Sequence, residues 1–254
     1  MPFFRYYIKR LTRLEQEVDK RAFRTSIILS CWLTVLFWMI KLFETATGLE
    51  FTRAGIYPLH LKGIPGILFS PFIHSDWKHL IANTGPFLFL TFSLFYFYRK
   101  KATEIYLTIW ILSGLMVWLA AREAWHIGAS GIIYGLASFL FFSGVIRNDA
   151  RLLTIAVIVA FLYGGMIWGV LPLKPEISWE GHLWGGIAGI VLAFIFRKEG
   201  PESPIKSLHT KPDSYDRTDW NYWNRNITSD HVNVSSSEDF EFTYRYSRKD
   251  DNEN

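Results

Sequence analysis

The chain has 254 residues, is 50% hydrophobic and 17% aromatic, and carries a net charge of +4. The charge is unevenly spread, because residues 198–254 carry −4 and residues 1–197 carry +8 between long apolar runs. This apolar composition excludes a disordered chain and a collagen-like chain. Cys31 is the single cysteine, which excludes a disulfide scaffold. The basic residues flank apolar segments, so they indicate membrane topology and no nucleic-acid partner.

Six apolar segments approach the roughly 20 residues that a helix needs to cross the hydrocarbon core. They occupy residues 25–43, 79–98, 104–121, 130–146, 152–171 and 181–196. We therefore expect an all-α, multi-pass integral membrane protein whose six-helix core spans residues 25–197. A basic segment, residues 1–24, precedes the core, and a polar tail, residues 198–254, follows it and is expected to be disordered. The tail aromatics Trp220, Tyr222, Trp223 and residues 240–246 form either a binding segment or scattered side chains.

Basic residues between the segments indicate which side of the membrane each loop occupies. With a cytoplasmic N-terminus, fourteen Lys and Arg residues up to Lys198 lie on the cytoplasmic side and six on the outer side. Both termini are therefore expected in the cytoplasm, and the second, fourth and sixth segments run inward from the outer face. Residues 44–78 mix apolar residues with three prolines, so we expect an irregular loop that rests partly in the outer leaflet.

Polar side chains gather at the start of these three inward segments, and polar groups inside a membrane are functional candidates. His79 and Asn83 lie one turn apart at the start of the second segment, Ser130 begins the fourth, and His182 is near the start of the sixth. Because all three segments enter from the same face, these four side chains are expected in one layer near the outer side of the bundle.

Glycines at four-residue spacing indicate which helices touch, because small residues let helices approach closely in lipid. The fourth segment has Gly131 and Gly135, and the sixth has Gly181, Gly185 and Gly189. Contact between these faces brings the Ser130 hydroxyl within reach of the His182 imidazole. A serine beside a histidine base is the minimum arrangement for nucleophilic acyl transfer. We expect a polar cavity that opens outward between the second, fourth and sixth segments, under the 44–78 loop.

Each feature also has a simpler interpretation. A serine in a membrane helix can bond to a carbonyl one turn earlier, a His or Asn at a helix start can cap it, and spaced glycines can serve packing alone. Zinc binding is a further alternative, through His74, His79, His126 and His182, but the chain has neither an HExxH motif nor an acidic ligand pair.

Taken together, these motifs resemble those of the rhomboid family of intramembrane serine proteases. The matching elements follow the family's order over residues 25–197: His79 with Asn83, Gly128-Ala129-Ser130-Gly131 followed by Tyr134, and His182 with Gly185 and Gly189. The resemblance implies a six-helix core and hydrolysis of peptide bonds in or next to transmembrane segments of protein substrates, with no cofactor and no metal.

The resemblance also implies roles for single residues. Ser130 would be the nucleophile and His182 the general base of a Ser-His dyad, with Tyr134 packed on the His182 ring. The His79 and Asn83 side chains and the Ser130 N–H would form the oxyanion hole. A bacterial inner membrane suits a six-helix core that lacks a seventh helix.

The sequence departs from the family in the first loop. Many members carry a Trp-Arg pair there, whereas residues 65–68 read Pro-Gly-Ile-Leu and no Trp-Arg dipeptide occurs in the chain. His74 matches a loop histidine of the family and is expected to hydrogen-bond within the loop. Two other function classes are weighed: a non-proteolytic rhomboid relative that binds membrane clients, and a small transporter or channel, which predicts mid-membrane charges and an internal repeat that the sequence does not have.

Overall fold

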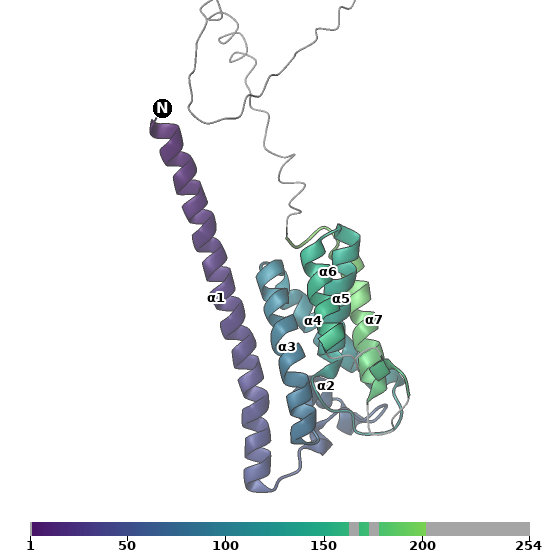
Figure 1. Cartoon of the computed structure of the whole chain (residues 1–254). Coiled ribbons are helices and arrows are strands. Elements are labelled where there is room, and N and C mark those ends of the chain that lie inside the picture. The colour runs from purple at the N-terminus through teal and green to yellow at the C-terminus, as the bar shows by residue number, and fades with distance from the viewer. Residues whose placement is uncertain (1, 163–167, 173–177, 202–254) are drawn as a thin grey trace, which may run out of the picture. The chain divides into compact units, whose positions relative to one another are not determined.

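The computed structural model describes residues 2–162, 168–172 and 178–201. The greater part of the polar tail, residues 202–254 with both aromatic clusters, lies outside the described residues. Among the described residues the fold is helical, with the α-helices α1 Pro2–Thr47, α2 Gly66–Phe69, α3 Trp77–Tyr98, α4 Ala102–Ala120, α5 Ser130–Arg147, α6 Ala150–Leu162 and α7 Trp179–Ile195 (Figure 1). Within this described part no strand forms, and the β-pairing is one isolated bridge between Ile56 and His126.

In the described part of the chain, four helices are long and apolar enough to cross a membrane: Gln16–Thr47 within α1, and the whole of α3, α4 and α5. α7 is a shorter apolar helix of 17 residues. The expected all-α membrane protein is thus confirmed, whereas the number of six spanning helices stays a prediction.

Two helices differ in extent from the apolar segments predicted for them. The first helix contains the predicted segment 25–43 and also the basic residues before it, from Pro2 onward, because Lys, Arg and Glu are good helix formers that hydropathy does not register. The fifth helix, α6, is described as far as Leu162, and residues 163–167 of the predicted segment 152–171 lie outside the described residues. Residues Trp168–Val170 form a 3-10 turn, η4, so an apolar run alone did not indicate where this helix stops.

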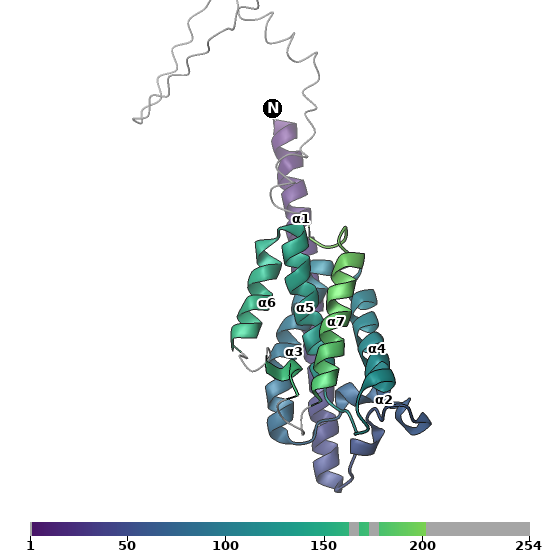
Figure 2. The ribbon, with the colours of Figure 1, turned by 90° about the vertical axis from the view of Figure 1, so that its right-hand side faces the viewer.

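The central helix is α5, which packs against α3, α4, α6 and α7, and its contact with α7 is the most extensive in the fold. Figure 2 shows α5 flanked by α6 and α7, with α4 on the other side of α7. α1 lies along α3 at the margin of the bundle (Figure 1). Fully buried apolar side chains from α3, α4 and α5, including Phe87, Ile109 and Phe139, fill the space between these helices.

The chain between α1 and α3 forms short turns rather than a simple hairpin. These are the 3-10 turns η1 Thr52–Ala54, η2 Leu61–Gly63 and η3 Ser70–Phe72, and the single turn α2. Indole N–H groups of α4 fix them, because Trp110 donates to the Ile67 carbonyl and Trp118 to the His60 carbonyl, each at 3.0 Å. Leu59, Leu61, Leu68 and Phe69 are exposed, which fits the predicted contact with the outer leaflet.

Candidate active site

The polar residues singled out from the sequence lie at the starts of α5 and of two helices that pack against it, α3 and α7. Ser130 is the first residue of α5, His79 and Asn83 occupy the first two turns of α3, and His182 is in the first turn of α7. Asp76 fixes the start of α3, since its carboxylate Oδ1 accepts the His79 backbone N–H at 2.9 Å. On the same turn, Ser75 Oγ lies 3.2 Å from His79 Nδ1.

Gly128 lies against the two proposed oxyanion donors. Its φ of +106° is in the left-handed region that favours glycine. A methyl group on Gly128 would lie 2.8 Å from Cε1 and Nε2 of His79 and 3.7 Å from Nδ2 of Asn83. The segment that leads into Ser130 therefore passes directly over the imidazole edge and the amide, with no room for a side chain.

Asn83 has an unusual environment for a buried amide. Its side chain is buried, and its Nδ2 donor makes no hydrogen bond to any described residue. A buried donor without an acceptor costs about 1–3 kcal/mol, so such groups in folded proteins call for an explanation. This unpaired donor lies beside His79 and Gly128, next to the turn that leads into Ser130.

Two contacts orient the His182 ring. Its Nδ1 lies 2.7 Å from the carbonyl oxygen of Gly169, in η4, and the ring stacks on Tyr134 with centroids 4.2 Å apart and planes at 8°. Because a carbonyl oxygen only accepts, Nδ1 carries the proton, and Nε2 of the neutral ring keeps its lone pair. Sequence reasoning missed Gly169, and no sequence signal could have indicated it, since the main chain makes the contact.

The two glycine faces pack directly on each other. A methyl group on Gly185 would overlap the Gly131 carbonyl oxygen, and one on Gly189 would overlap the Gly135 carbonyl oxygen. One on Gly131 would lie 3.3 Å from the Gly181 carbonyl oxygen. The predicted close approach of the fourth and sixth segments is therefore present, as contact between the α5 and α7 backbones.

Ser130 and His182 lie on these touching faces, next to Gly131 and Gly181. Both are buried, each with 9% of its surface exposed. Among the described residues, no hydrogen bond joins the Ser130 hydroxyl to the His182 ring. In substrate-free enzymes such bonds are often long and shorten once substrate is bound.

A small cavity of about 30 Å³ adjoins Ser130. Its polar lining comes from Ser70, Ser113, His126, Ser130 and Ser178, and its walls from the loop before α3, from α4 and from the starts of α5 and α7. The predicted fourth and sixth segments, α5 and α7, thus border this cavity, whereas the predicted second segment, α3, does not line it and α4 does. A polar cavity between the second, fourth and sixth segments stays a prediction. Room of this size holds one or two water molecules.

Further polar residues lie around this cavity. His126 Nδ1 is 2.6 Å from Ser178 Oγ, and its Nε2 donates to the Arg122 carbonyl. Burial is the main cause of the lowered pKa of His126. Glu180 is buried and lies 3.5 Å from the Arg122 guanidinium, an ion pair that sequence reasoning did not anticipate. The described part of the chain holds no group of three or more His, Cys, Asp or Glu side chains suited to a metal ion.

His74 bonds to its surroundings through its main chain, and neither ring nitrogen makes a hydrogen bond to a described residue, so the loop hydrogen bond expected of its side chain is not formed. Its carbonyl oxygen accepts a hydrogen bond from Lys41 at 2.9 Å, and its ring lies 5.0 Å from that of His79, centroid to centroid. Burial, with smaller contributions from His79 and Lys41, lowers the pKa of His74 to about 3, so the ring is neutral at physiological pH.

Comparison with known proteins identifies relatives of this chain. Residues 63–199, more than half of the chain, match the model of the Rhomboid domain. The uncharacterized proteins Mb1372 of Mycobacterium bovis and Rv1337 of Mycobacterium tuberculosis are each 34% identical over 182 residues, covering 68% of this chain and 75% of theirs. The uncharacterized protein ML1171 of Mycobacterium leprae is 32% identical over 183 residues, covering 68% of this chain and 71% of its own. With the helical fold and the ordered motifs, these matches establish that the chain belongs to the rhomboid family.

Proposed function

We propose that the protein is an intramembrane serine endopeptidase that hydrolyses peptide bonds in or next to the transmembrane segments of protein substrates. Ser130 is the nucleophile and His182 the general base. The side chains of His79 and Asn83, with the Ser130 N–H, are the oxyanion donors. Ser130 begins α5, and the first N–H groups of a helix have no acceptor within it, so this donor is available.

The observation that carries the proposal is the unpaired Nδ2 of Asn83. This donor is buried, has no partner among the described residues and lies beside Gly128, at the turn that leads into Ser130. An oxyanion that forms at Ser130 would supply the missing acceptor. Donors held ready for a developing charge are the largest single contribution in many acyl-transfer enzymes.

The orientation of His182 supports its role as base. With Nδ1 committed to the Gly169 carbonyl, Nε2 is the nitrogen left to take the proton of Ser130. Oγ then attacks the substrate carbonyl carbon, and the oxyanion accepts from the His79 Nε2–H, from Asn83 and from the Ser130 N–H. This tautomer of neutral His79 requires its Nδ1 to accept the proton of the Ser75 hydroxyl. The imidazolium returns the proton to the leaving amine, and water hydrolyses the acyl-enzyme. The cavity beside Ser130 is large enough to hold this water.

The substrate must present an accessible peptide bond. The carbonyls of an intact helix are occupied by its own hydrogen bonds, so a substrate helix has to unwind locally before it is cut. Segments with small or helix-destabilising residues near the outer face are the expected substrates. Six spanning helices in a bacterial inner membrane, with both termini in the cytoplasm and lipid around the core, complete the proposal.

The alternative is a non-proteolytic relative that binds membrane clients, and the absence of a Ser130–His182 hydrogen bond in this state favours it. A serine-reactive fluorophosphonate distinguishes the two, because only an activated serine is labelled. Labelling confined to Ser130 fits the protease. No labelling and no cleavage of any transmembrane reporter would leave the client-binding function.

Substitutions of single residues test the roles assigned to Ser130, His182 and Asn83. Loss of Ser or His in a site that acts as a unit costs up to about 10⁶ in turnover, and loss of one oxyanion donor about 10² to 10³. We therefore expect Ser130→Ala and His182→Ala to abolish cleavage of a transmembrane reporter in detergent, and Asn83→Ala to leave a measurable remnant. Ser93→Ala is the control, since Ser93 is a buried serine of α3 that bonds to the Phe89 carbonyl. Full activity in Ser130→Ala would disprove the nucleophile assignment.

A further inference from the structure

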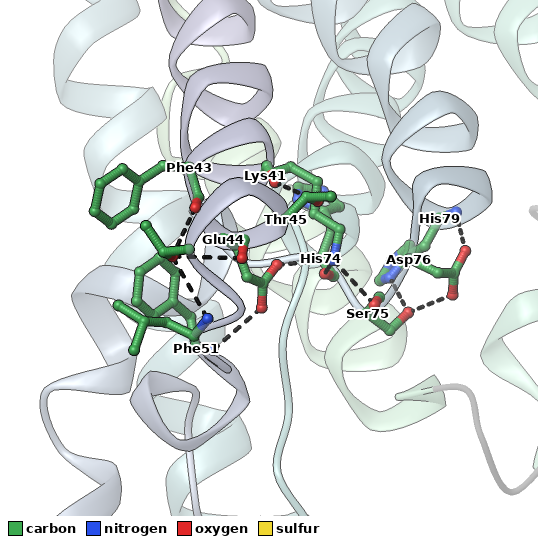
Figure 3. A network of polar contacts seen from close by, with 11 residues as sticks. Lys41, Phe43, Glu44, Thr45, Phe51, His74, Ser75, Asp76 and His79 are labelled. Carbon is green, nitrogen blue, oxygen red and sulfur yellow. Dashed lines mark hydrogen bonds and ion pairs between the residues drawn. The ribbon is translucent and has the colours of Figure 1, made fainter.

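A buried charged group joins the end of α1 to the loop that leads into α3 (Figure 3). Lys41 is 8% exposed, and its ammonium donates to Glu44 Oε2 at 2.7 Å, to the His74 carbonyl at 2.9 Å and to the Ser75 carbonyl at 3.1 Å. An ammonium has three donors, and these three acceptors use all of them. Lys41 was counted from the sequence as an outer-side topology charge, but it lies inside α1 and faces the loop.

Glu44 extends this group to the other end of the loop. Its second carboxylate oxygen, Oε1, accepts the backbone N–H of Phe51 at 3.1 Å. The pair thus bonds the chain just after α1 and again just before α3, so both ends of a long loop are held on the last turns of one helix. This chain has no Trp-Arg pair in the loop, and the Lys41–Glu44 pair is an anchor that does not depend on one.

The anchored end of the loop leads directly to the candidate site. Ser75, whose carbonyl accepts from Lys41, has its hydroxyl 2.7 Å from Asp76 Oδ2 and 3.2 Å from His79 Nδ1. Asp76 caps α3 through the His79 N–H. The other edge of the His79 ring faces Gly128, where a methyl group would be 2.8 Å from Nε2. A shift of the Ser75 backbone therefore moves the imidazole against the Ser130 turn.

We propose that Lys41 and Glu44 are positioning residues: they hold the His74–Ser75 backbone so that the His79 imidazole stands at the oxyanion position. This rests on the proposed protease function. Lys41 touches no reacting atom and acts through His79. A misplacement of about 1 Å in an active site can lower turnover by about 10²-fold, and complete loss of a donor by 10² to 10³.

The first test is steady-state cleavage of a transmembrane reporter by the full chain. We expect Lys41→Met to lower kcat about 10- to 100-fold with little change in KM, and Lys41→Arg, which keeps a buried cation with several donors, to recover part of that loss. Lys101→Met is the matched control, because Lys101 and Glu104 form the same i,i+3 pair at 2.8 Å on an exposed surface. An unchanged kcat in Lys41→Met, with an active wild type, would overturn the positioning role and leave the protease intact.

A double-mutant cycle separates positioning from general destabilisation. If Lys41 acts through His79, then Lys41→Met has little further effect on kcat in a His79→Ala background. Full additivity of the two losses would mean that Lys41 acts by another route. If Lys41→Met does not fold, Glu44→Gln takes its place, because glutamine keeps an acceptor for the Phe51 N–H and removes the charge. We expect Glu44→Gln to lower kcat less than Lys41→Met does, and to cause no further loss of kcat in a His79→Ala background.

Amide hydrogen exchange tests the anchor without catalysis. In Lys41→Met, amides of residues 74–80 should exchange at least about 10-fold faster than in wild type, while those in the middle of α5 are unchanged. Equal exchange in the 74–80 segment would reject the anchor whatever the activity. Faster exchange in a chain that neither cleaves reporter nor reacts with fluorophosphonate would reject the protease function and keep the anchor.

Discussion

The contact of α5 with α7 and the contact of α1 with the loop before α3 are held in opposite ways. The first is backbone against backbone, since Gly185 packs on the Gly131 carbonyl and leaves no space there for a methyl group. The second is a buried Lys41–Glu44 pair bonded to loop carbonyls and an amide. Lipid gives helices no hydrophobic reason to associate, so close packing of small residues serves deep in the bundle. At its edge, where loops leave main-chain groups unpaired, a charge with several donors serves instead.

The largest effect is expected from filling the glycine contact. Gly185→Ala puts a methyl group onto the Gly131 carbonyl, so α5 and α7 must move apart. Overpacking of this kind costs about 1–3 kcal/mol or more, and the shift separates Ser130 from His182. We expect a clear fall in the thermal unfolding midpoint and loss of reporter cleavage.

The neighbouring glycine provides the control for that substitution. A methyl group on Gly186 would lie 3.4 Å from Ser138 Oγ, an ordinary contact. Gly186→Ala should therefore be neutral or slightly stabilising, since alanine is the better helix former by about 1 kcal/mol. Equal destabilisation by the two substitutions would show that helix propensity, not the α5–α7 approach, decides the outcome.

Acid should destabilise the loop before α3, which contains the buried His74, and not the α5–α7 glycine contact, which has no titratable group. The pKa of His74 is lowered to about 3 in the folded protein, against 6.5 as its ordinary value. Below pH 6.5 the unfolded chain binds a proton that the folded chain refuses. The stability from neutral burial is thus present above pH 6.5 and is lost progressively as the pH falls toward 3. We expect the unfolding midpoint to drop over this range, and His74→Phe to reduce the slope.

An exposed histidine of the same loop is the comparison for His74. His60 is exposed, and His60→Phe is the matched control for exchanging a histidine for a phenylalanine in this loop. A wild-type midpoint that stays level from pH 7 to pH 4, measured in one detergent, would contradict the buried neutral state of His74.

The smallest change in stability is expected from the loss of one hydrogen bond between α1 and α3, which an indole N–H donates. Trp38 Nε1 donates to Thr84 Oγ1 at 3.1 Å, a neutral hydrogen bond of about 1 kcal/mol. Trp38→Phe should lower the free energy of unfolding by about that amount and leave kcat intact. Trp32→Phe is the reference, because Trp32 is 71% exposed. If Trp38→Phe lowered the free energy of unfolding more than Gly185→Ala does, the α1–α3 contact would contribute more to stability than the α5–α7 contact, contrary to this prediction.

Features carried by residue type and spacing were predictable from the sequence. The four-residue glycine spacing predicted the α5–α7 contact, and the polar residues at three helix starts predicted which side chains lie at the candidate site. Hydropathy was a poorer guide to length. α1 extends to Pro2 through charged residues that suit a helix, and residues 168–170, near the end of the predicted fifth segment, form the 3-10 turn η4.

The remaining features depend on tertiary contacts that leave no local pattern. A count of loop charges treats Lys41 as a topology signal, and only the folded loop shows that its ammonium bonds to His74 and Ser75. The cavity lies against α4 because the loop residues Ser70 and Ile67 fold over that helix, and spacing within single segments does not report this.

The Gly169 carbonyl that accepts from His182 has a consequence for how the reaction can be tuned or lost. A main-chain oxygen has no codon of its own, so no point substitution deletes it, whereas an aspartate in the same role is one replacement away from removal. It also has no titration of its own and bears only a partial charge, so it steadies a cationic ring less than a carboxylate would. In the proposed protease, the His182 base therefore keeps a hydrogen-bond partner that neither a point substitution nor acid removes.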